Sequence, residues 1–288
     1  MHPHSLEVGR KPESRRRKLV TQNEMSTKST VLPRAHASFP HEKSTSFPQQ
    51  NLRRSPVELE IVIPADNEAN RISHTLSETI DFLGSQSWDV RIVVVDNGSG
   101  DETGTIVRRI ATQRAGTVPV ALVGCSFPGK GAAVRRGMLS GTSKYTGFFD
   151  ADLATPLDTL SRAMEALKSG AAAVIASRHA AGSTFVRPQH LTRRVGGTAF
   201  RLLAKSMVQG VTDTQCGFKF FERDAVTRAM VQCRTTGFAF DVELLQRLQR
   251  GGESIVEIPV AWTDGPGSTF NPIRDGFASF ASVLQMQR

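Results

Sequence analysis

The chain has few cysteines, and they do not fall in pairs. Three are present, Cys125, Cys216 and Cys233, and none belongs to a CxxC motif. An odd number without paired spacing argues against a disulfide framework and against a structural zinc site. Reduced thiols are typical of proteins of the cytoplasm, where disulfides are rare.

Long apolar runs are also missing. The longest, such as Ala171–Ala176, have the length of a strand, whereas a membrane-spanning helix needs roughly 18–20 apolar residues. No apolar segment follows the basic N-terminus, so a secretory signal is not expected. We therefore expect a cytoplasmic protein that is soluble or is bound peripherally at the inner face of the membrane.

Acidic residues are scarce near the N-terminus. The formal net charge is +9, but residues 1–55 hold 11 of the 36 Lys and Arg and only 4 of the 27 Asp and Glu, which gives this segment +7 and residues 56–288 only +2. The segment is rich in Ser, Pro and Gln and lacks hydrophobic periodicity, so we expect a disordered basic tail. Its run Arg15–Lys18 could contact anionic lipid or nucleic acid, although a merely solvated tail is the simpler interpretation. The nearly neutral remainder argues against a nucleic-acid-binding protein.

From Val57 onward, apolar patterns typical of strands alternate with patterns typical of helices. Strands are predicted over residues 57–63, 90–95, 118–123, 145–149, 172–176, 215–221 and 254–262. Helices are predicted over residues 68–83, 102–114, 131–139, 157–168, 191–208 and 241–250. This alternation predicts an α/β domain over residues 56–270, with a mainly parallel sheet and helices on both faces. The second half is less regular, and residues 271–288 are expected to hold a short amphipathic helix.

Polar clusters follow four of the predicted strands. They are Asp66-Asn67-Glu68, Asp96-Asn97-Gly98-Ser99, Gly129-Lys130-Gly131 and Asp150-Ala151-Asp152. Parallel sheets bind ligands at the carboxyl ends of their strands. Four such clusters at one edge indicate a binding site more strongly than any one of them alone.

Asp150 and Asp152 stand two residues apart directly after an apolar strand. Carboxylates in this arrangement can converge on one divalent cation, and Mg²⁺ or Mn²⁺ favours oxygen ligands that it shares with substrate phosphates. Such a cation would neutralise the charge that builds on a departing diphosphate. Two acids in a loop are more often only solvated, so the motif needs support from its surroundings.

The turn Gly129-Lys130-Gly131 precedes a predicted helix. A helix N-terminus favours a bound phosphate, and Lys130 adds positive charge. The stretch Gly124–Lys130 also matches most of a Walker A loop, but Gly131 stands where a Ser or Thr must bind Mg²⁺. This difference argues against a P-loop NTPase.

Asp96 begins the turn after the second strand. A carboxylate there can accept a hydrogen bond from a base or a ribose. The alternative is a turn that only caps the helix beginning near Asp101.

Together these motifs resemble the inverting family 2 glycosyltransferases of the GT-A fold. In the second half, Ser177-Arg178, the stretch Asp213–Phe221 (DTQCGFKFF) and the stretch Phe240–Leu245 (FDVELL) resemble the branch of dolichyl-phosphate β-glucosyltransferases and dolichyl-phosphate mannose synthases. The likeness covers roughly residues 57–270. It is most specific in DTQCGFK and leans toward the glucosyl members.

The resemblance implies a role for each matching residue. Pro64, Glu68 and Asp96 would line the nucleotide base and ribose, Lys130 would lie near the nucleotide or its diphosphate, and Asp150 and Asp152 would bind the cation. Arg178 would hold an acceptor phosphate together with Arg187, Arg193 or Arg194, because a guanidinium binds phosphate in a bidentate manner. Gln215, Asp213, Asp241 and Glu243 would face the sugar or the acceptor. For an acceptor hydroxyl, one of Asp213, Asp241 and Glu243 would be the general base; for Asp241, a simple helix N-cap is the alternative.

The implied reaction transfers a hexose, with glucose favoured, from a nucleotide-sugar to a polyprenyl phosphate or a similar phosphate. UDP is favoured as the nucleotide and GDP is possible. The chain shows no hydrophobic anchor, which favours a second hypothesis, transfer to a soluble small molecule. The family usually has an aromatic residue where Asp66 stands, which leaves a third hypothesis, a nucleotide-sugar-binding protein without turnover.

Overall fold

The computed structural model describes residues 57–185 and 204–263. In this part of the chain, no helix has both the length and the apolar character that crossing a bilayer requires. The predictions for the tail 1–55 and the helix within 271–288 lie outside the described residues. So do those for Arg187, Arg193 and Arg194, and most of the helix expected at 191–208.

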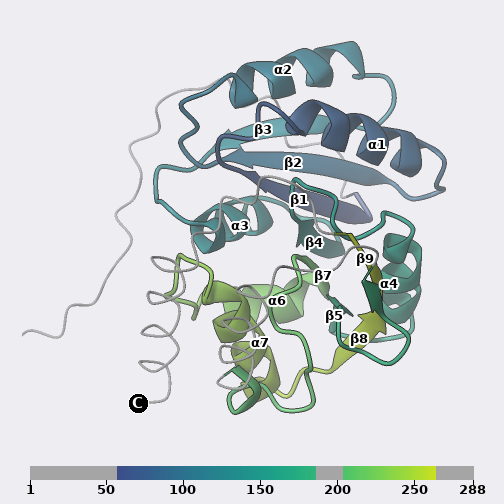
Figure 1. The fold of residues 1–288 in the computed structure, drawn as a ribbon, viewed down its shortest axis with the longest axis vertical. Coiled ribbons are helices and arrows are strands. Elements are labelled where there is room, and N and C mark those ends of the chain that lie inside the picture. Colours follow the sequence, from purple (N-terminus) through teal and green to yellow (C-terminus); the bar gives the residue numbers. More distant parts are fainter. Residues whose placement is uncertain (1–56, 186–203, 264–288) are drawn as a thin grey trace, which may run out of the picture. The chain divides into compact units, whose positions relative to one another are not determined.

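A seven-stranded sheet forms the centre of the fold (Figure 1), in the order β3-β2-β1-β4-β7-β5-β8. Its strands are β1 (Leu59–Ala65), β2 (Val90–Asp96), β3 (Val120–Gly124), β4 (Tyr145–Phe149), β5 (Ala173–Ser177), β7 (Phe218–Glu222) and β8 (Ile255–Pro259). All neighbours pair in parallel except β7, which is antiparallel to both β4 and β5. The chain adds β2 and β3 on one side of β1 and β4 on the other, so the strand order reverses at β1. Ligands bind at such a reversal in open α/β sheets.

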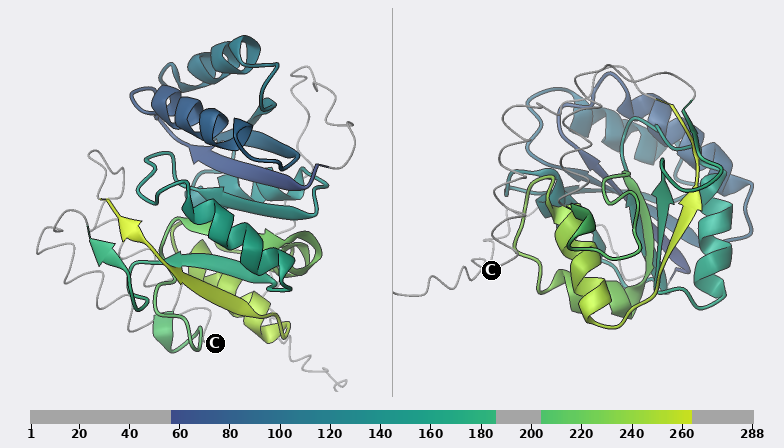
Figure 2. Two further views of the ribbon diagram at one scale, coloured as in Figure 1. Left: turned by 90° about the vertical axis from the view of Figure 1, so that its right-hand side faces the viewer. Right: turned by 60° about the horizontal axis from the view of Figure 1, so that its bottom comes forward.

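Helices cover both faces of the sheet (Figure 2). They are α1 (Ile72–Gly84), α2 (Thr103–Gln113), α3 (Lys130–Leu139), α4 (Thr159–Lys168), α6 (Arg223–Met230) and α7 (Phe240–Arg250). Because side chains alternate along a strand, Ile61 of β1 packs in one core with α1, α2 and α4. Its neighbour Val62 packs in a second core with α3, α6 and α7. The central strands are therefore buried on both faces, as their continuous apolar sequences predict.

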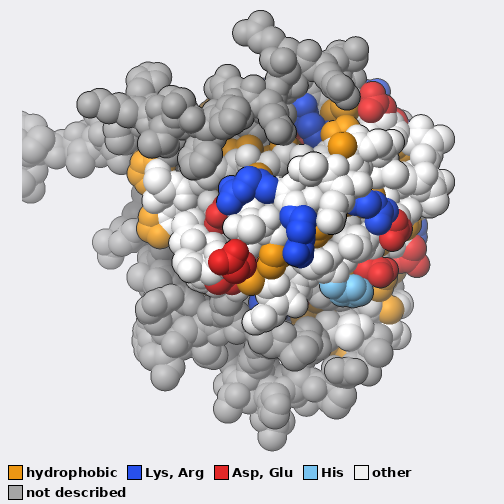
Figure 3. Space-filling view, turned by 90° about the horizontal axis from the view of Figure 1, so that it is seen from above, with side chains coloured by type: hydrophobic (Ala, Val, Ile, Leu, Met, Phe, Trp, Pro, Cys, Tyr) orange, Lys and Arg blue, Asp and Glu red, His pale blue; other side chains and the backbone are white. Residues whose placement is uncertain are grey.

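The face over α1 and α2 carries both signs of charge. Figure 3 shows basic and acidic side chains interspersed there, with hydrophobic side chains scattered among them. Asp81 of α1 and Arg114, which follows α2, form an ion pair that joins the two helices. Exposed pairs of this kind contribute little to stability.

The predicted alternation of strands and helices is confirmed, with two differences. The structure contains α6, where no helix was predicted. The strand predicted over 254–262 is divided into β8 and the short β9 (Ala261–Trp262), and β9 pairs in parallel with the short β6 (Thr184–Phe185) in a separate two-stranded sheet.

Candidate active site

The four polar clusters meet at one edge of the sheet. The backbone N–H of Asn67 donates to Ser99 Oγ at 3.0 Å, which joins the first cluster to the second. Asn97 Oδ1 accepts the Gly129 N–H at 2.9 Å, which joins the second to the third. Lys130 Nζ lies 2.7 Å from Asp150 Oδ1, which joins the third to the fourth. The prediction that these clusters share an edge is therefore confirmed.

The residues expected around a nucleoside lie at the ends of β1 and β2. Pro64 pairs with Val95 in the parallel register of these strands. Asp96 Oδ1 accepts the Ser99 N–H at 3.0 Å, so the turn-capping role is present. Its Oδ2 accepts no hydrogen bond from the described residues and remains available to a ligand. Glu68 Oε2 accepts from Arg71 Nε at 2.6 Å.

Burial raises the pKa of Glu68, and the nearby Asp152 and Asp150 add to this, although Arg71 opposes it. Glu68 is therefore close enough to Asp150 and Asp152 for their negative charges to disfavour its ionised form.

Another segment of the chain packs closely against the turn Gly129–Gly131. The carbonyl oxygen of Thr236 accepts the Ala132 N–H at 3.2 Å. A Cβ placed on Gly129 would lie 2.4 Å from the same oxygen, and Gly129 has φ of +109°. The glycines are needed because another segment packs closely against the N-terminus of α3. The Ala132 N–H is thus satisfied within the chain, and phosphate binding by this turn stays a prediction.

Lys130 is directed toward the acidic pair. Burial alone would lower its pKa, but the carboxylates of Asp150, Asp241 and Asp152 outweigh burial and raise the pKa. The side chain is therefore a cation at neutral pH. Its Nζ also lies 5.4 Å from the centroid of the Phe148 ring.

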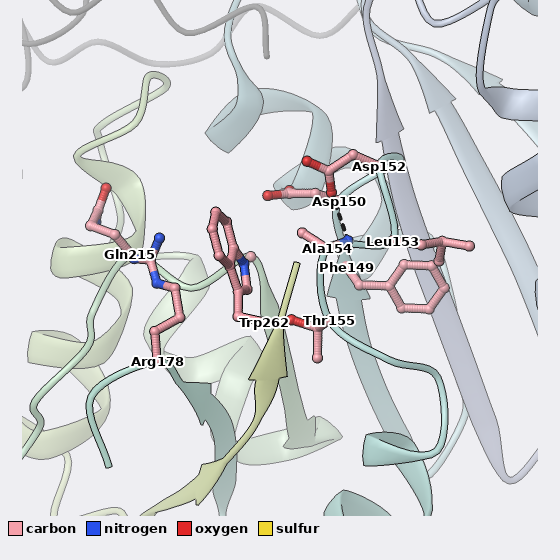
Figure 4. A pocket seen from close by; sticks show the side chains of 10 residues that line it. Phe149, Asp150, Asp152, Leu153, Ala154, Thr155, Arg178, Gln215 and Trp262 are labelled. Atoms are coloured by element: carbon pink, nitrogen blue, oxygen red, sulfur yellow. Dashed lines mark hydrogen bonds between the residues drawn. The ribbon is translucent and has the colours of Figure 1, made fainter. Parts of the chain in front are cut away.

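The protein balances the negative charges of Asp150 and Asp152 only in part. Asp150 is 40% exposed, and the Lys130 ammonium lies beside its Oδ1. Asp152 Oδ1 accepts the Ala154 N–H at 3.1 Å (Figure 4). The pKa of Asp152 is raised, first by burial and then by the negative charge of Asp150.

These features fit a divalent cation that would complete its coordination with phosphate oxygens. In the described part of the chain, no group of three or more His, Cys, Asp or Glu side chains could hold a metal ion by itself.

A glycine sets the space beside Asp150. The Asp150 N–H donates to the Gly217 carbonyl at 3.0 Å, between the end of β4 and the segment before β7. A Cβ on Gly217 would lie 1.8 Å from Asp150 Oδ2. Any larger residue would therefore displace the carboxylate, which explains why the DTQCGFK stretch has glycine here.

A pocket lies between the acidic pair and Arg178. In Figure 4, Asp150 and Asp152 lie on one side, Arg178 and Gln215 on the other, and Trp262 between them. Ten residues line this pocket: Phe149, Asp150, Asp152, Leu153, Ala154, Thr155, Arg178, Gln215, Gly217 and Trp262.

Arg178 is oriented by Asp213. Its Nε and Nη2 donate to the two carboxylate oxygens at 2.7 and 2.8 Å, and its backbone N–H donates to Oδ2 at 3.0 Å. Burial alone would raise the pKa of Asp213, but the charge and hydrogen bonds of Arg178 outweigh it and hold the pKa well below its usual range. A carboxylate in this state is a poor proton acceptor, so Asp213 is a positioning residue for Arg178.

Asp241 and Glu243, both expected to face the sugar or acceptor, are buried at the start of α7. Asp241 Oδ1 accepts from Nζ of the fully buried Lys219 at 2.6 Å. Glu243 Oε2 accepts the backbone N–H groups of Arg234 and Thr235 at 2.9 and 2.8 Å. Neither side chain lines the pocket. Their partners indicate that Asp241 balances a buried lysine and that Glu243 fixes the 234–235 loop.

Sequence patterns did not indicate Trp262 or Thr155 as site residues. Trp262 lies on β9, which ends beside the pocket although it is distant in sequence from every polar cluster. A single aromatic at the end of a strand gives no motif, so this contact follows only from the tertiary fold.

Comparison with known proteins identifies the family. The model of Glycosyl transferase family 2 matches residues 60–229. The dolichyl-phosphate beta-glucosyltransferase of Dictyostelium discoideum is 30% identical, over 84% of this chain and 76% of that protein. The protein of the same name from Saccharomyces cerevisiae is 32% identical, over 79% of this chain and 74% of its own length.

The fold also matches solved structures. One is glucosyl-3-phosphoglycerate synthase from Mycobacterium tuberculosis in complex with Mn²⁺, uridine-diphosphate and glucosyl-3-phosphoglycerate, with a TM-score of 0.60, 20% identity, and coverage of 80% of this chain and 79% of that one. At this identity the likeness concerns the fold, which is GT-A. The resemblance drawn from the motifs is thus confirmed, and the chain belongs to glycosyl transferase family 2.

Proposed function

We propose that the protein is an inverting, metal-dependent glucosyltransferase that moves glucose from UDP-glucose to a polyprenyl phosphate. The names of the relatives that are 30–32% identical support glucose as the sugar and a polyprenyl phosphate as the acceptor. The observation that carries the proposal is the pocket, in which an acidic pair suited to a cation lies opposite an oriented guanidinium.

On the donor side, Asp150 and Asp152 would hold Mg²⁺ or Mn²⁺. The cation, when bound, would neutralise charge on the leaving diphosphate. Lys130 supplies a second positive charge beside it. Pro64, Glu68 and Asp96 would contact the base and ribose, and Asp96 Oδ2 would accept a hydrogen bond from a ribose hydroxyl. Gln215 would contact the sugar from the opposite side of the pocket.

On the acceptor side, Arg178 would hold the phosphate. Its Nε and Nη2 are held by Asp213, while Nη1 has no partner among the described residues and is free to donate. An oxygen of the acceptor phosphate would attack the anomeric carbon on the face opposite UDP. The new bond forms as the bond from that carbon to the diphosphate oxygen breaks. The electron pair leaves with UDP, and the configuration inverts.

The geometry favours a phosphate over a hydroxyl acceptor. A phosphate is already ionised and needs no general base, whereas a hydroxyl must lose its proton. The carboxylates proposed as that base are unsuited to it: the pKa of Asp213 is held low by Arg178, and Asp241 and Glu243 are buried on other partners.

Product analysis tests this proposal. The full chain would be incubated with Mn²⁺, radiolabelled UDP-glucose or GDP-mannose, and either citronellyl phosphate or glycerol 3-phosphate. We expect an organic-soluble, acid-labile β-glucosyl phosphate that forms from UDP-glucose and citronellyl phosphate. A product formed only with the water-soluble phosphate would instead support the soluble-acceptor hypothesis. UDP-glucose binding without turnover on either acceptor would support a binding protein.

A lipid acceptor requires contact with a membrane surface. We include in the proposal that the basic segment 1–55, with its run Arg15–Lys18, binds anionic headgroups. Sedimentation with phosphatidylserine vesicles should then fall as salt rises and should be lost when this segment is deleted. Equal sedimentation with neutral vesicles would contradict this contact.

A further inference from the structure

Aromatic rings continue outward from Arg178. The guanidinium carbon of Arg178 lies 5.4 Å from the centroid of the Trp262 ring. Phe185 packs edge-on against the same indole, with centroids 5.9 Å apart and an angle of 73° between the planes. From the pocket outward, the order is therefore a cation, an indole and a phenyl ring.

The backbone fixes this order. Phe185 of β6 is paired in register with Trp262 of β9. The Thr184 N–H donates to the Val260 carbonyl at 3.0 Å. Ser183 Oγ donates to the Ser177 carbonyl at 2.6 Å, which holds the start of β6 against the end of β5. The two rings are thus part of a paired structure that is anchored beside Arg178.

The outer ring is open to solvent. Phe185 is 42% exposed, while Trp262 is 9% exposed. The other exposed large hydrophobic side chains in the described part of the chain are the aliphatic Leu139, Val231 and Val256. Single exposed hydrophobics need no explanation. Phe185 differs because its ring is continuous with the wall of the pocket.

We propose that Trp262 and Phe185 form a shelf for the first isoprene units of the acceptor while its phosphate is bound at Arg178. This inference rests on the proposed function. In a prenyl phosphate, the anionic head is joined directly to a branched hydrocarbon, and this site joins a cation directly to an aromatic surface. A phosphorylated glycerol or sugar places hydroxyls next to its phosphate, and ring faces would leave them without hydrogen-bond partners.

Phe185→Ala tests the shelf directly. Removing the phenyl ring should raise KM for citronellyl phosphate about tenfold, since covering a large apolar side chain contributes this order of affinity. A long polyprenyl phosphate in detergent should show the same factor, because the shelf reaches only the first units. Phe185→Leu should restore most of the affinity. The effect on kcat, and on KM for UDP-glucose, should stay below about twofold.

Val231→Ala is the matched control. It removes another exposed apolar side chain, one that follows α6 and does not line the pocket, and it should leave both KM values unchanged. The shelf is refuted if wild type transfers glucose to citronellyl phosphate and Phe185→Ala does so with the same KM. It is also refuted if Phe185→Ala and Val231→Ala lose affinity equally. Failure of the proposed function would look different, because wild type itself would then glucosylate no prenyl phosphate.

Discussion

Asp150 and Asp213 each pair with a cation, but the pairing leaves them in different states. Asp150 is 40% exposed, and its Oδ1 lies beside the Lys130 ammonium. Asp213 is 3% exposed and gives both oxygens to Arg178. A divalent cation can therefore approach Asp150, whereas Asp213 is committed to orienting Arg178, which lines the pocket.

Replacing either member of the acidic pair should remove most activity. For Asp150→Asn or Asp152→Asn we expect kcat/KM to fall by about a hundredfold or more, because a bound cation contributes several kcal/mol to stabilising a charged leaving group. Steady-state kinetics over a range of Mn²⁺ concentrations measures this. Asp158→Asn, at an exposed position before α4 where the side chain makes no capping hydrogen bond, is the control. Full activity of the Asp150 variant in excess EDTA would contradict the metal proposal.

Asp213 should also make stability depend on pH. Its pKa is held low in the folded protein, while the pKa of an Asp in an unfolded chain is about 3.9. The ionised form therefore stabilises the fold above the unfolded pKa, and this contribution is lost as pH falls toward the folded pKa. Asp213→Asn should cost about 2–3 kcal/mol at neutral pH, less than a fully buried pair because Arg178 is partly exposed.

Urea unfolding of wild type and Asp213→Asn at several pH values between 7 and 3 would measure this dependence. The difference in unfolding free energy should be constant above about pH 5 and should shrink below it. A difference that stays the same down to pH 3 would show that the lost hydrogen bonds, and not the charge of Asp213, carry the effect.

At the scale of elements, the sequence predicted the first half of the fold well. Strands such as β2 and β4 are buried on both faces, so they appear as continuous apolar segments of the right length. The second half was harder. The antiparallel direction of β7 depends on its partners in the sheet, and β6 has only two residues. The helix α6 begins after Glu222, whose carboxylate accepts the Ala225 N–H at 2.7 Å, and it is only 8 residues long, so its helical apolar spacing extends over too few residues to be distinctive.

The candidate site, like the fold, could be predicted from the sequence only in part. The acidic pair at Asp150 could be predicted because a local motif at a strand end gives it. The partner of Arg178 could not be derived from a pattern, since Asp213 lies 35 residues away. The glycines of the turn at Gly129 also allow a close contact with the Thr236 carbonyl, which could not be predicted because such a contact has no sequence signature.

The pair Lys219–Asp241 links β7 to α7 and should act as a structural unit. Lys219→Met leaves the Asp241 carboxylate buried without its cation, and we expect a loss of about 3–5 kcal/mol. The double variant Lys219→Met, Asp241→Leu removes both charges and should recover much of this loss. Urea unfolding in a double-mutant cycle measures the coupling. If the stable double variant transfers no glucose while it still binds UDP, Asp241 has a catalytic role after all.

At the scale of the whole molecule, the proposed donor site joins β1, β2, α3 and β4, so a ligand there should stabilise the fold by mass action. UDP and Mn²⁺ together should raise Tm by several degrees, and each alone by much less, because the cation would be shared between the acidic pair and the diphosphate. Differential scanning fluorimetry with UDP, GDP and Mn²⁺ in all combinations measures this. Asp150→Asn should lose the combined shift, whereas Asp158→Asn should keep it. An equal shift from UDP with and without Mn²⁺ would mean that Lys130 alone balances the diphosphate and that the acidic pair has another role.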